Sequence, residues 1–494
     1  MSINVLLIGG GGREHALAWR LSKSPGLGTL FITHPQNPGL SALGTPVDVP
    51  VDARSLFRVK RFCEKNNVSL VVIGPEDPLA EGFADHLSAP GRVVFGPTRE
   101  GARLEWDKAW AKQLMRGASI PTAEAKAFTI AESARLYLET RVPEDLLLGR
   151  LFVEANSQRD PERRRAFIAK RIASDKALSL AFAQAREDLP VVKASGLAKG
   201  KGVVVPSSLA EAFDAVERMM VRREFGEAGS TILIEERLEG REASVFALVD
   251  GRNIYVLETA QDHKRLRDAD EGPNTGGMGA FTPSPIIDEA TMGTIQREIL
   301  VPTVDALRRE GIDYRGVIYV GLMLTPAGPK VLEYNARFGD PECQVLLPRL
   351  EGDLLDILHA TAERRLDEAH VGWLPGASCG VVLASEGYPD KPIIGRTIHG
   401  LEEAAEVPGV TIFHSGTEKK ASGEIVTAGG RVLCVTAVGA TLDEARARSY
   451  RAAELIRFEG RHFRTDIGRQ GGEGGARGTI ERTHSRPFAP APGE

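Results

Sequence analysis

The feature that most constrains the fold is an alternation of strand and helix patterns between residue 3 and about residue 104. Short apolar runs bounded by Gly, Pro or polar residues have the length and composition of buried strands: "INVLLIG", "TLFIT", "SLVVIG" and "RVVFG". Helical stretches such as "REHALAWRLSK" separate them. This alternation predicts a parallel sheet that is covered by helices on both faces.

The rest of the chain predicts antiparallel pairing and further domains. A helix is expected over 107–116, and closely spaced strand patterns follow from about residue 189. The turn sequences "VDGRN" and "TPAGP" each separate two such patterns and predict hairpins. Strand and helix patterns return from about 377 to 468, whereas the tail 469–494 is rich in Gly and Pro and predicts disorder. The sequence therefore predicts a multidomain chain of α/β and α+β parts, divided at about 104 and 370.

Composition excludes several classes of function. Lys and Arg number 62 against 67 Asp and Glu, so no global basic field indicates a nucleic-acid partner. No apolar run reaches the ~18 residues that a membrane span needs. The cysteines, Cys63, Cys343, Cys379 and Cys434, are far apart, which favours a reducing compartment and a cytoplasmic protein.

A polar row interrupts the strand pattern of "KVLEYNARFGDPECQ", residues 330–344. Side chains alternate along a strand, so Glu333, Asn335 and Arg337 would leave the same face. Mg²⁺ favours one or two such oxygen ligands together with substrate phosphates. We therefore expect Glu333 and Asn335 to bind the metal and Arg337 to neutralise phosphoryl charge. Simple exposure of the row to solvent is the alternative.

The turn "IGGGGREH", Ile8 to His15, directly follows the first strand. Its glycines would let backbone N–H groups approach an anion at a helix N-terminus. The dinucleotide fingerprint is incomplete, because Glu14 or His15 takes the place of the third glycine. A phosphate or carboxylate of a small substrate is therefore preferred to NAD, and a plain tight turn is the alternative.

A second glycine-rich stretch, "VVKASGLAKGKGVVV", lies between two strand patterns at 191–205. It differs from a phosphate-binding P-loop, because three residues rather than four separate Gly196 from Gly200, and Gly202 replaces the metal-binding hydroxyl. A mobile flap that carries Lys199 and Lys201 over phosphates fits better, and an ordinary basic hairpin is the alternative.

Two further stretches supply polar candidates. "ILIEERLEGREAS" carries acids at 235, 236 and 242, which could contact a nucleoside or be solvated. "QDHKRLRDADEGPNTGGMGAFTPSP", residues 261–285, has no periodicity, and loops of this length tend to be functional or disordered. By contrast, the basic run "QRDPERRRAFIAKR" is interpreted as a solvated helix face without chemistry.

Taken together, these motifs resemble the ATP-grasp superfamily and, within it, the phosphoribosylamine–glycine ligase family. The stretches that carry the resemblance run in family order over nearly all of residues 3–468, and the most specific are "QDHKR…GPNTGGMGA" and "RFGDPE". The resemblance implies an N-terminal parallel α/β substrate domain (1–104), a two-lobed ATP-grasp core (105–370) and a C-terminal α+β domain (371–468). The flap lobe would span about 129–255. An insertion at about 130–185 exceeds what the family carries there.

The resemblance also implies roles for individual residues. Contacts to ATP would come from Lys108, Lys193, Gly196, Gly200, Lys201, Gly202, Glu235, Glu236 and Glu242. The substrates would contact Gly10, Gly11, Gly12, Arg13, Glu76, Asn274, Thr275 and Gly276. The reacting centre would hold Asp262, Lys264, Arg337 and Asp340. Glu333 and Asn335 would bind Mg²⁺ or Mn²⁺, although the strand "GVIYVGLML" lacks the metal-binding acid that many ATP-grasp enzymes have there.

The implied reaction is an ATP-dependent ligation of glycine to 5-phosphoribosylamine through glycyl phosphate, a step of purine biosynthesis. The implied partners are these small molecules, with no nucleic acid or membrane, and the chain is expected to be a monomer. Two alternatives remain within reach of the sequence: another ATP-grasp carboxylate–amine ligase and a non-catalytic nucleotide-binding regulator. A nicotinamide oxidoreductase is disfavoured by the incomplete glycine fingerprint.

Overall fold

The computed structural model describes residues 2–184, 188–198 and 200–469, which form two compact units. The larger unit contains the described residues up to Glu105, Ala118–Ile120 and those from Arg241 onward. The smaller unit contains Trp106–Gly117 and the described residues of Pro121–Gly240. The tail predicted to be disordered lies, apart from Arg469, outside the described residues.

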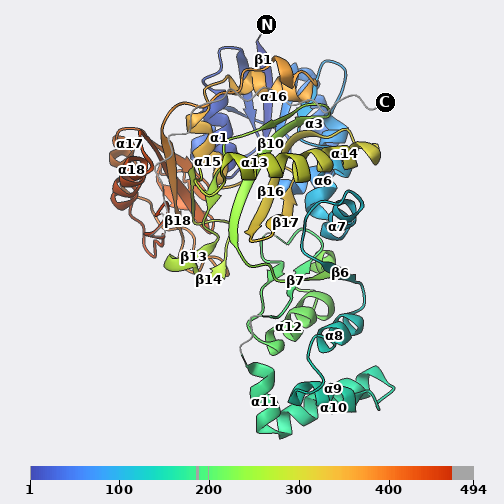
Figure 1. Cartoon of the computed structure of the whole chain (residues 1–494). Helices are drawn as coiled ribbons and strands as arrows, with labels where there is room; N and C mark the ends of the chain where they lie inside the picture. The colour runs from blue at the N-terminus through green and yellow to red at the C-terminus, as the bar shows by residue number, and fades with distance from the viewer. Residues whose placement is uncertain (1, 185–187, 199, 470–494) are drawn as a thin grey trace. The chain divides into compact units, whose positions relative to one another are not determined.

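The first sheet of the larger unit is parallel, as the alternation predicts. Its strands are ordered β3-β2-β1-β4-β5 and comprise Thr45–Pro46, Leu27–Ile32, Ile3–Ile8, Val68–Ile73 and Val93–Phe95. The connecting helices are α1 (Gly12–Leu21), α2 (Pro38–Ser41), α3 (Leu56–Lys65), α4 (Glu76–Ala80), α5 (Phe83–Leu87) and α6 (Arg99–Trp106) (Figure 1). Strand order reverses at β1, so the loops that follow β1 and β4 face each other across the sheet edge where α/β proteins bind ligands.

A second sheet in this unit is antiparallel, with the order β11-β10-β16-β17. Its strands are Ile254–Val256, Arg241–Asp250, Arg315–Thr325 and Gly328–Asn335. Both hairpins predicted from turn sequences are confirmed, because β10 pairs with β11 and β16 pairs with β17. Helix α16 (Leu354–Ala362) packs against β5, β10 and β16, and so links the first two sheets through one apolar core.

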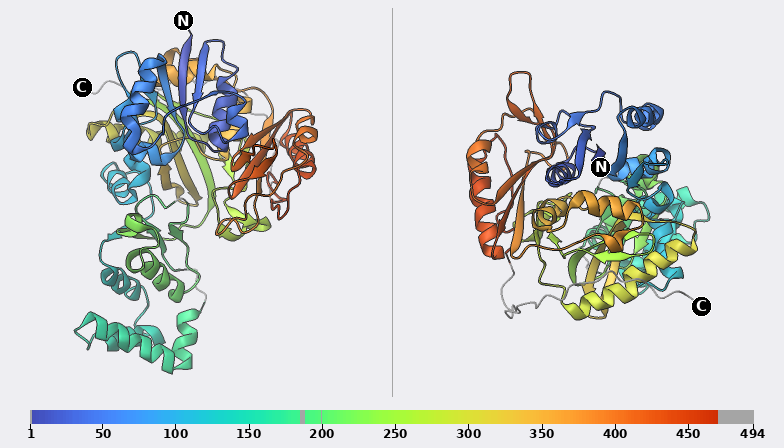
Figure 2. Two further views of the ribbon diagram at one scale, coloured as in Figure 1. Left: turned by 180° about the vertical axis from the view of Figure 1, so that it is seen from behind. Right: turned by 90° about the horizontal axis from the view of Figure 1, so that it is seen from above.

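A third sheet joins the C-terminal chain to the stretch 261–285. Its order is β12-β15-β18-β22-β19, with strands Gln261–Asp262, Gly279–Thr282, Ala377–Ala384, Arg431–Gly439 and Val410–His414. Helix α18 (Leu442–Leu455) packs on one face, and α15 (Glu342–Leu346) packs on the opposite face (Figures 1 and 2). The stretch 261–285 is therefore more regular than its sequence suggests, because β12 and β15 pair within a sheet whose next strand is nearly a hundred residues away.

The remaining elements of the larger unit are short pieces around these sheets. Residues 265–274 form the hairpin β13 (Arg265–Arg267) and β14 (Glu271–Asn274), and β20 (Thr417–Lys419) pairs with β21 (Ile425–Thr427). The helices are α13 (Glu289–Ile295), α14 (Val301–Arg309) and α17 (Leu401–Ala405). Most of the polar residues singled out above in this unit lie on, or shortly after, strands β1, β4, β12, β14 and β17.

The smaller unit has its own sheet and two apolar cores. The sheet order is β6-β9-β7-β8, with strands Ala125–Phe128, Ile232–Glu235, Val191–Ala194 and Val203–Val204. The predicted helix over 107–116 is α7 (Lys108–Gly117). Helix α12 (Leu209–Val216) belongs to the same core as the sheet, together with α8 (Ala131–Glu139). A second core is formed mainly by α9 (Leu147–Ala155), α10 (Pro161–Ser174) and α11 (Lys176–Ala183).

Within the described parts of both units, no helix combines the length and the apolar character that a membrane span requires. The division of the chain at about 104 and 370, and the insertion at about 130–185, stay predictions.

Candidate active site

The glycine-rich turn and Glu76 lie at neighbouring strand ends of the parallel sheet. Residues 10–13 follow β1, and Glu76 is the first residue of α4 after β4. The backbone N–H of Gly74 donates to the carbonyl of Ile8 at 3.0 Å, so the two loops begin side by side. The structure thus brings together two parts of the predicted substrate site.

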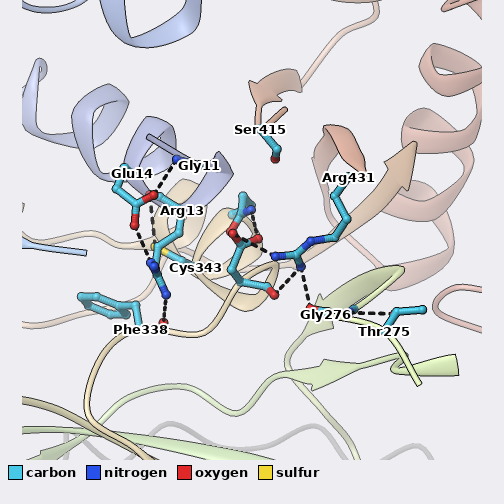
Figure 3. A network of polar contacts seen from close by, with 12 residues as sticks. Gly11, Arg13, Glu14, Thr275, Gly276, Phe338, Cys343, Ser415 and Arg431 are labelled. Atoms are coloured by element: carbon cyan, nitrogen blue, oxygen red, sulfur yellow. Dashed lines mark hydrogen bonds and ion pairs between the residues drawn. The ribbon is translucent and has the colours of Figure 1, made fainter. Parts of the chain in front are cut away.

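Arg13 and Glu14 form a buried pair at this turn (Figure 3). The backbone N–H of Gly11 donates to Glu14 Oε2 at 2.7 Å, and Arg13 Nε donates to Glu14 Oε1 at 2.6 Å. Arg13 Nη1 also donates to the carbonyl of Phe338 at 3.1 Å. Arg13 therefore connects the turn to the loop after β17, while Glu14, which the sequence marked only as a missing glycine, accepts from the turn itself.

The polar row on β17 has the predicted alternation. Glu333, Asn335 and Arg337 are half-buried, whereas the side chains between them are buried. Asn335 Oδ1 accepts from Arg337 Nη2 at 3.3 Å. Among the described residues no three His, Cys, Asp or Glu side chains cluster as metal ligands. One carboxylate and one amide oxygen nevertheless fit the mode in which Mg²⁺ keeps most of its sphere for water and substrate phosphates.

Two carboxylates fix the guanidinium of Arg337. Its Nε donates to Glu76 Oε2 at 3.2 Å, and its Nη2 lies 2.8 Å from Glu105 Oε1. Glu105 Oε2 also accepts from the backbone N–H of Ala336 at 2.8 Å. Burial alone would raise the pKa of Glu76, but Arg337 and Arg13 lower it to about 2. The guanidinium is thus oriented by side chains of the protein itself, which is the preorganisation that charge stabilisation requires.

A second charged cluster surrounds Lys264, which follows β12. Its Nζ lies 3.3 Å from Glu242 Oε2 and 3.9 Å from Glu333 Oε1. Burial would lower the pKa of Lys264, but nearby acidic groups, among them Glu242 and Asp262, raise it well above the ordinary value. Burial raises the pKa of Asp262, and burial together with Asp262 raises that of Glu342 to about 7. Predicted metal and reacting-centre residues therefore share one cluster.

The loop after β14 is tied to the same cluster through its backbone. Both the N–H and the Oγ1 of Thr275 donate to the carbonyl of Lys264, at 2.7 and 2.8 Å, and Gly277 N–H donates to Thr275 Oγ1 at 3.0 Å. Asn274 ends β14 opposite Arg265. The structure therefore brings the predicted residues at 262–276 together with those on β17.

In the smaller unit, Lys193 and Glu235 form an ion pair across adjacent strands. Lys193 Nζ lies 2.8 Å from Glu235 Oε2, and Lys112 Nζ of α7 lies 3.5 Å from Glu235 Oε1. All three side chains are buried. Burial lowers the pKa of Lys112 to about 8, although Glu235 opposes this shift. Two buried lysines that share one glutamate are suited to an anionic ligand.

The glycine-rich stretch forms the expected antiparallel hairpin of β7 and β8. Ala194 N–H donates to the carbonyl of Gly202 at 2.7 Å, and Lys201 N–H donates to that of Ala198 at 2.9 Å. Gly200 has a positive φ of 76°. Lys199 lies outside the described residues.

Lys108 and Glu236 also lie in this unit. Lys108 Nζ donates to the carbonyl of Gly196 at 3.2 Å, which places the start of α7 beside the loop. Glu236 extends β9, and its backbone N–H donates to the carbonyl of Glu124 at 2.8 Å. The ATP residues predicted for this unit therefore surround β7, β9 and the start of α7, whereas Glu242 lies in the larger unit.

Comparison with known proteins identifies the family. The description "Phosphoribosylglycinamide synthetase" matches in three parts: an N domain at residues 3–105, an ATP-grasp (A) domain at 166–343 and a C domain at 378–470. A relative named phosphoribosylamine–glycine ligase, from Rhodopirellula baltica, is 43% identical over 466 residues, which cover 94% of this chain and 97% of the relative. The chain belongs to the phosphoribosylamine–glycine ligase family.

Solved structures agree with this assignment. The crystal structure of phosphoribosylamine–glycine ligase from Thermotoga maritima is 31% identical, with a TM-score of 0.71 and coverage of 94% of this chain and 100% of that one. The biotin carboxylase domain of a 2-oxoglutarate carboxylase from Hydrogenobacter thermophilus shares the fold at 17% identity and a TM-score of 0.62. The predicted fold class is confirmed, and the chain is an ATP-grasp ligase.

Sequence reasoning assigned no role to three charged residues, of which Glu105 and Lys112 are buried and Arg431 is half-buried. Glu105 and Lys112 both fall on the apolar faces of their helices, beside Ala102 and Met115 respectively. A charge in an apolar stripe is a signal of a buried partner, and it could have found both. Arg431, at the start of β22, contacts loops far away in the chain, and no local pattern marks it.

Proposed function

We propose that the chain joins glycine to 5-phosphoribosylamine at the expense of ATP, giving glycinamide ribonucleotide, ADP and phosphate. The ion pair between Arg337 and Glu76 carries the proposal, because it joins the candidate substrate edge of the parallel sheet to the candidate metal strand β17. Relatives with this activity in their names support the choice of substrates.

The charged and glycine-rich groups suggest which residues bind the nucleotide, which bind phosphoribosylamine and which hold the metal. We assign nucleotide binding to Lys108, Lys193, Glu235, Glu236 and the hairpin loop with Gly196, Gly200, Lys201 and Gly202, and also to Glu242. The amide N–H groups of Gly10 and Gly12, at the start of α1, suit the phosphate of phosphoribosylamine, while Gly11, whose N–H donates to Glu14, shapes the turn between them. Glu333 and Asn335 would hold Mg²⁺ or Mn²⁺, which would neutralise phosphate charge.

The reaction then needs positioning more than proton transfer. A glycine carboxylate oxygen attacks the γ-phosphorus of ATP, the bond to the β-phosphate oxygen breaks, and ADP leaves. The amine of phosphoribosylamine attacks the carbonyl carbon of glycyl phosphate, the bond from that carbon to the phosphate oxygen breaks, and the nitrogen releases a proton as the amide forms. Arg337 faces the developing phosphoryl charge, with Lys264, Asp262 and Asp340 around the reacting centre.

The chain's setting is part of the proposal. All four cysteines are free and buried, which suits a reducing cytoplasm. We infer a monomer that acts on small molecules and does not bind nucleic acid or a membrane.

Omission of each reactant tests the proposal. ADP release is measured with Mg-ATP, glycine and fresh phosphoribosylamine, and with each left out in turn. We expect ADP only when all three are present, and ADP that does not depend on glycine would point to another carboxylate substrate. Glu333→Ala should abolish metal-dependent turnover and keep the circular dichroism spectrum, whereas Glu418→Ala, at an exposed position of β20, should behave as wild type.

A further inference from the structure

Arg431 connects two loops of the candidate site. Its Nη1 donates to the carbonyl of Gly276 at 2.5 Å and to the carbonyl of Asp340 at 2.6 Å (Figure 3). Its Nη2 lies 3.3 Å from Asp340 Oδ2. One rigid guanidinium therefore sets the spacing between the loop after β14 and the loop after β17.

The peptide of Gly276 is held from the other side as well. Its backbone N–H donates to the hydroxyl of Tyr388 at 2.9 Å, and Tyr388 follows β18 in the same sheet as β22. A Cβ at Gly276 would lie 3.1 Å from the Cζ of Arg431, so a larger side chain there would push against the guanidinium. The close approach of the guanidinium therefore depends on a glycine at position 276.

The loop that Arg431 holds continues to the reacting centre. Gly276 directly follows Thr275, whose N–H and hydroxyl both donate to the carbonyl of Lys264. On the other loop, Asp340 Oδ1 accepts from Gln344 Nε2 at 2.7 Å, so its carboxylate is oriented from two sides. Burial would raise the pKa of Asp340, but Arg431 lowers it and keeps the carboxylate ionised.

We propose that Arg431 is a positioning residue of the ligation: it fixes Lys264 and Asp340 at the distance that the reaction needs. This inference rests on the function proposed above. A planar guanidinium can bond two carbonyls and a carboxylate at once, whereas an ammonium keeps the charge but not this geometry. Displacement of a positioned group by about 1 Å can cost on the order of 100-fold in rate. A loosened centre should also let water reach glycyl phosphate, so that ADP forms without product.

The test compares full-length Arg431→Met and Arg431→Lys with Arg446→Met as the matched control. Arg446 belongs to the same C-terminal segment and also donates to two backbone carbonyls, of Ile467 at 2.9 Å and Thr465 at 2.7 Å, neither of which belongs to the loop after β14 or to the loop after β17. The measurements are kcat, the KM of each substrate, the ratio of ADP to product, the melting temperature, and amide hydrogen exchange at residues 276–278.

We expect Arg431→Met to lower kcat by on the order of 100-fold, to raise the ratio of ADP to product above one, and to leave the KM for ATP within about twofold. Arg431→Lys should recover part of kcat. Exchange at residues 276–278 should quicken in Arg431→Met and not in Arg446→Met. The inference is overturned if the two methionine variants match in kcat and coupling, or if exchange there is unchanged. Exchange needs no turnover, so an inactive wild type would reject the proposed function and leave this test in place.

Discussion

Two groups of arginines in this molecule have different partners. The helix arginines, which we define as Arg164, Arg165 and Arg171 of α10, pair with carboxylates on neighbouring helices. Arg164 Nη1 lies 2.9 Å from an oxygen of Glu139 on α8, and Arg171 Nη1 lies 2.7 Å from Glu154 on α9. These pairs join side chain to side chain and leave the helical backbone to its own hydrogen bonds.

The site arginines, which we define as Arg13, Arg337 and Arg431, also donate to backbone carbonyls. Arg13 and Arg337 both donate to the carbonyl of Phe338, and Arg431 donates to two carbonyls. Loops have few internal backbone bonds, so such a donor fixes the path of the chain. The site arginines therefore order loop backbones, whereas the helix arginines hold helices together through their side chains.

Replacement of a site arginine should cost the most activity. We expect Arg337→Met to lower kcat by on the order of 100- to 1,000-fold, because preorganised charge is lost where phosphoryl charge develops. Arg337→Lys should recover little, since an ammonium cannot bond Glu76 and Glu105 in the same geometry. Steady-state ADP release measures both, with the exposed Arg308→Met as control. A loss below tenfold would remove Arg337 from the reacting centre.

Replacement of the buried helix arginine should cost stability alone. Arg164→Met leaves Glu139 buried without its partner, and we expect the free energy of unfolding to fall by about 3 kcal/mol. Both side chains are under a tenth exposed. Urea denaturation gives the loss, and kcat should stay within twofold of wild type. The double variant Arg164→Met, Glu139→Gln should regain part of the stability; a single variant with impaired turnover would contradict the comparison.

The free energy of unfolding should depend on pH through Glu76, the carboxylate partner of the site arginine Arg337. Glu76 has its pKa lowered from 4.5 to about 2 in the folded chain, so the unfolded chain binds its proton first as the pH falls. Its stabilisation is present above pH 4.5 and is lost towards pH 2. Between pH 6 and 4 wild type should therefore lose about 1 kcal/mol more than Glu76→Gln. Parallel stability curves for the two proteins over this range would disprove the ion pair with Arg337.

The exposed helix arginine should matter least. Arg171 and Glu154 are each about half exposed, and such surface pairs contribute roughly 0.2–1 kcal/mol. Arg171→Met should change the free energy of unfolding by about 0.5 kcal/mol and leave kcat unchanged. Raising the salt concentration should shrink the difference. A loss of unfolding free energy as large as that of Arg164→Met would show that burial does not determine how much the helix arginines stabilise the fold.

Much of the fold follows from local sequence patterns. The parallel sheet, both hairpins and the alternation of Glu333, Asn335 and Arg337 depend on neighbours within a few residues, so the sequence could predict them. The solvated face of α10 is also largely confirmed, since Arg163, Arg165 and Lys170 are exposed, and Arg164 alone is buried among the basic residues of that helix.

The contacts that complete the site were not predictable in the same way. Glu105 accepts from a residue 231 positions away, and Arg431 donates to carbonyls 155 and 91 positions away. No periodicity connects such positions. The strands β12 and β15 were missed for the same reason, because they are set by pairing with a distant strand rather than by their own composition.

The apolar cores of the two units have consequences for synthesis on the ribosome. The core beneath the parallel sheet extends from Val5 to Cys434, so its first residues emerge from the ribosome long before its last ones. The cores of the smaller unit close within residues 128–234. Because units tend to fold as they emerge, the smaller unit should become fully protease-resistant before the larger one, whose core is complete only when nearly the whole chain has been made.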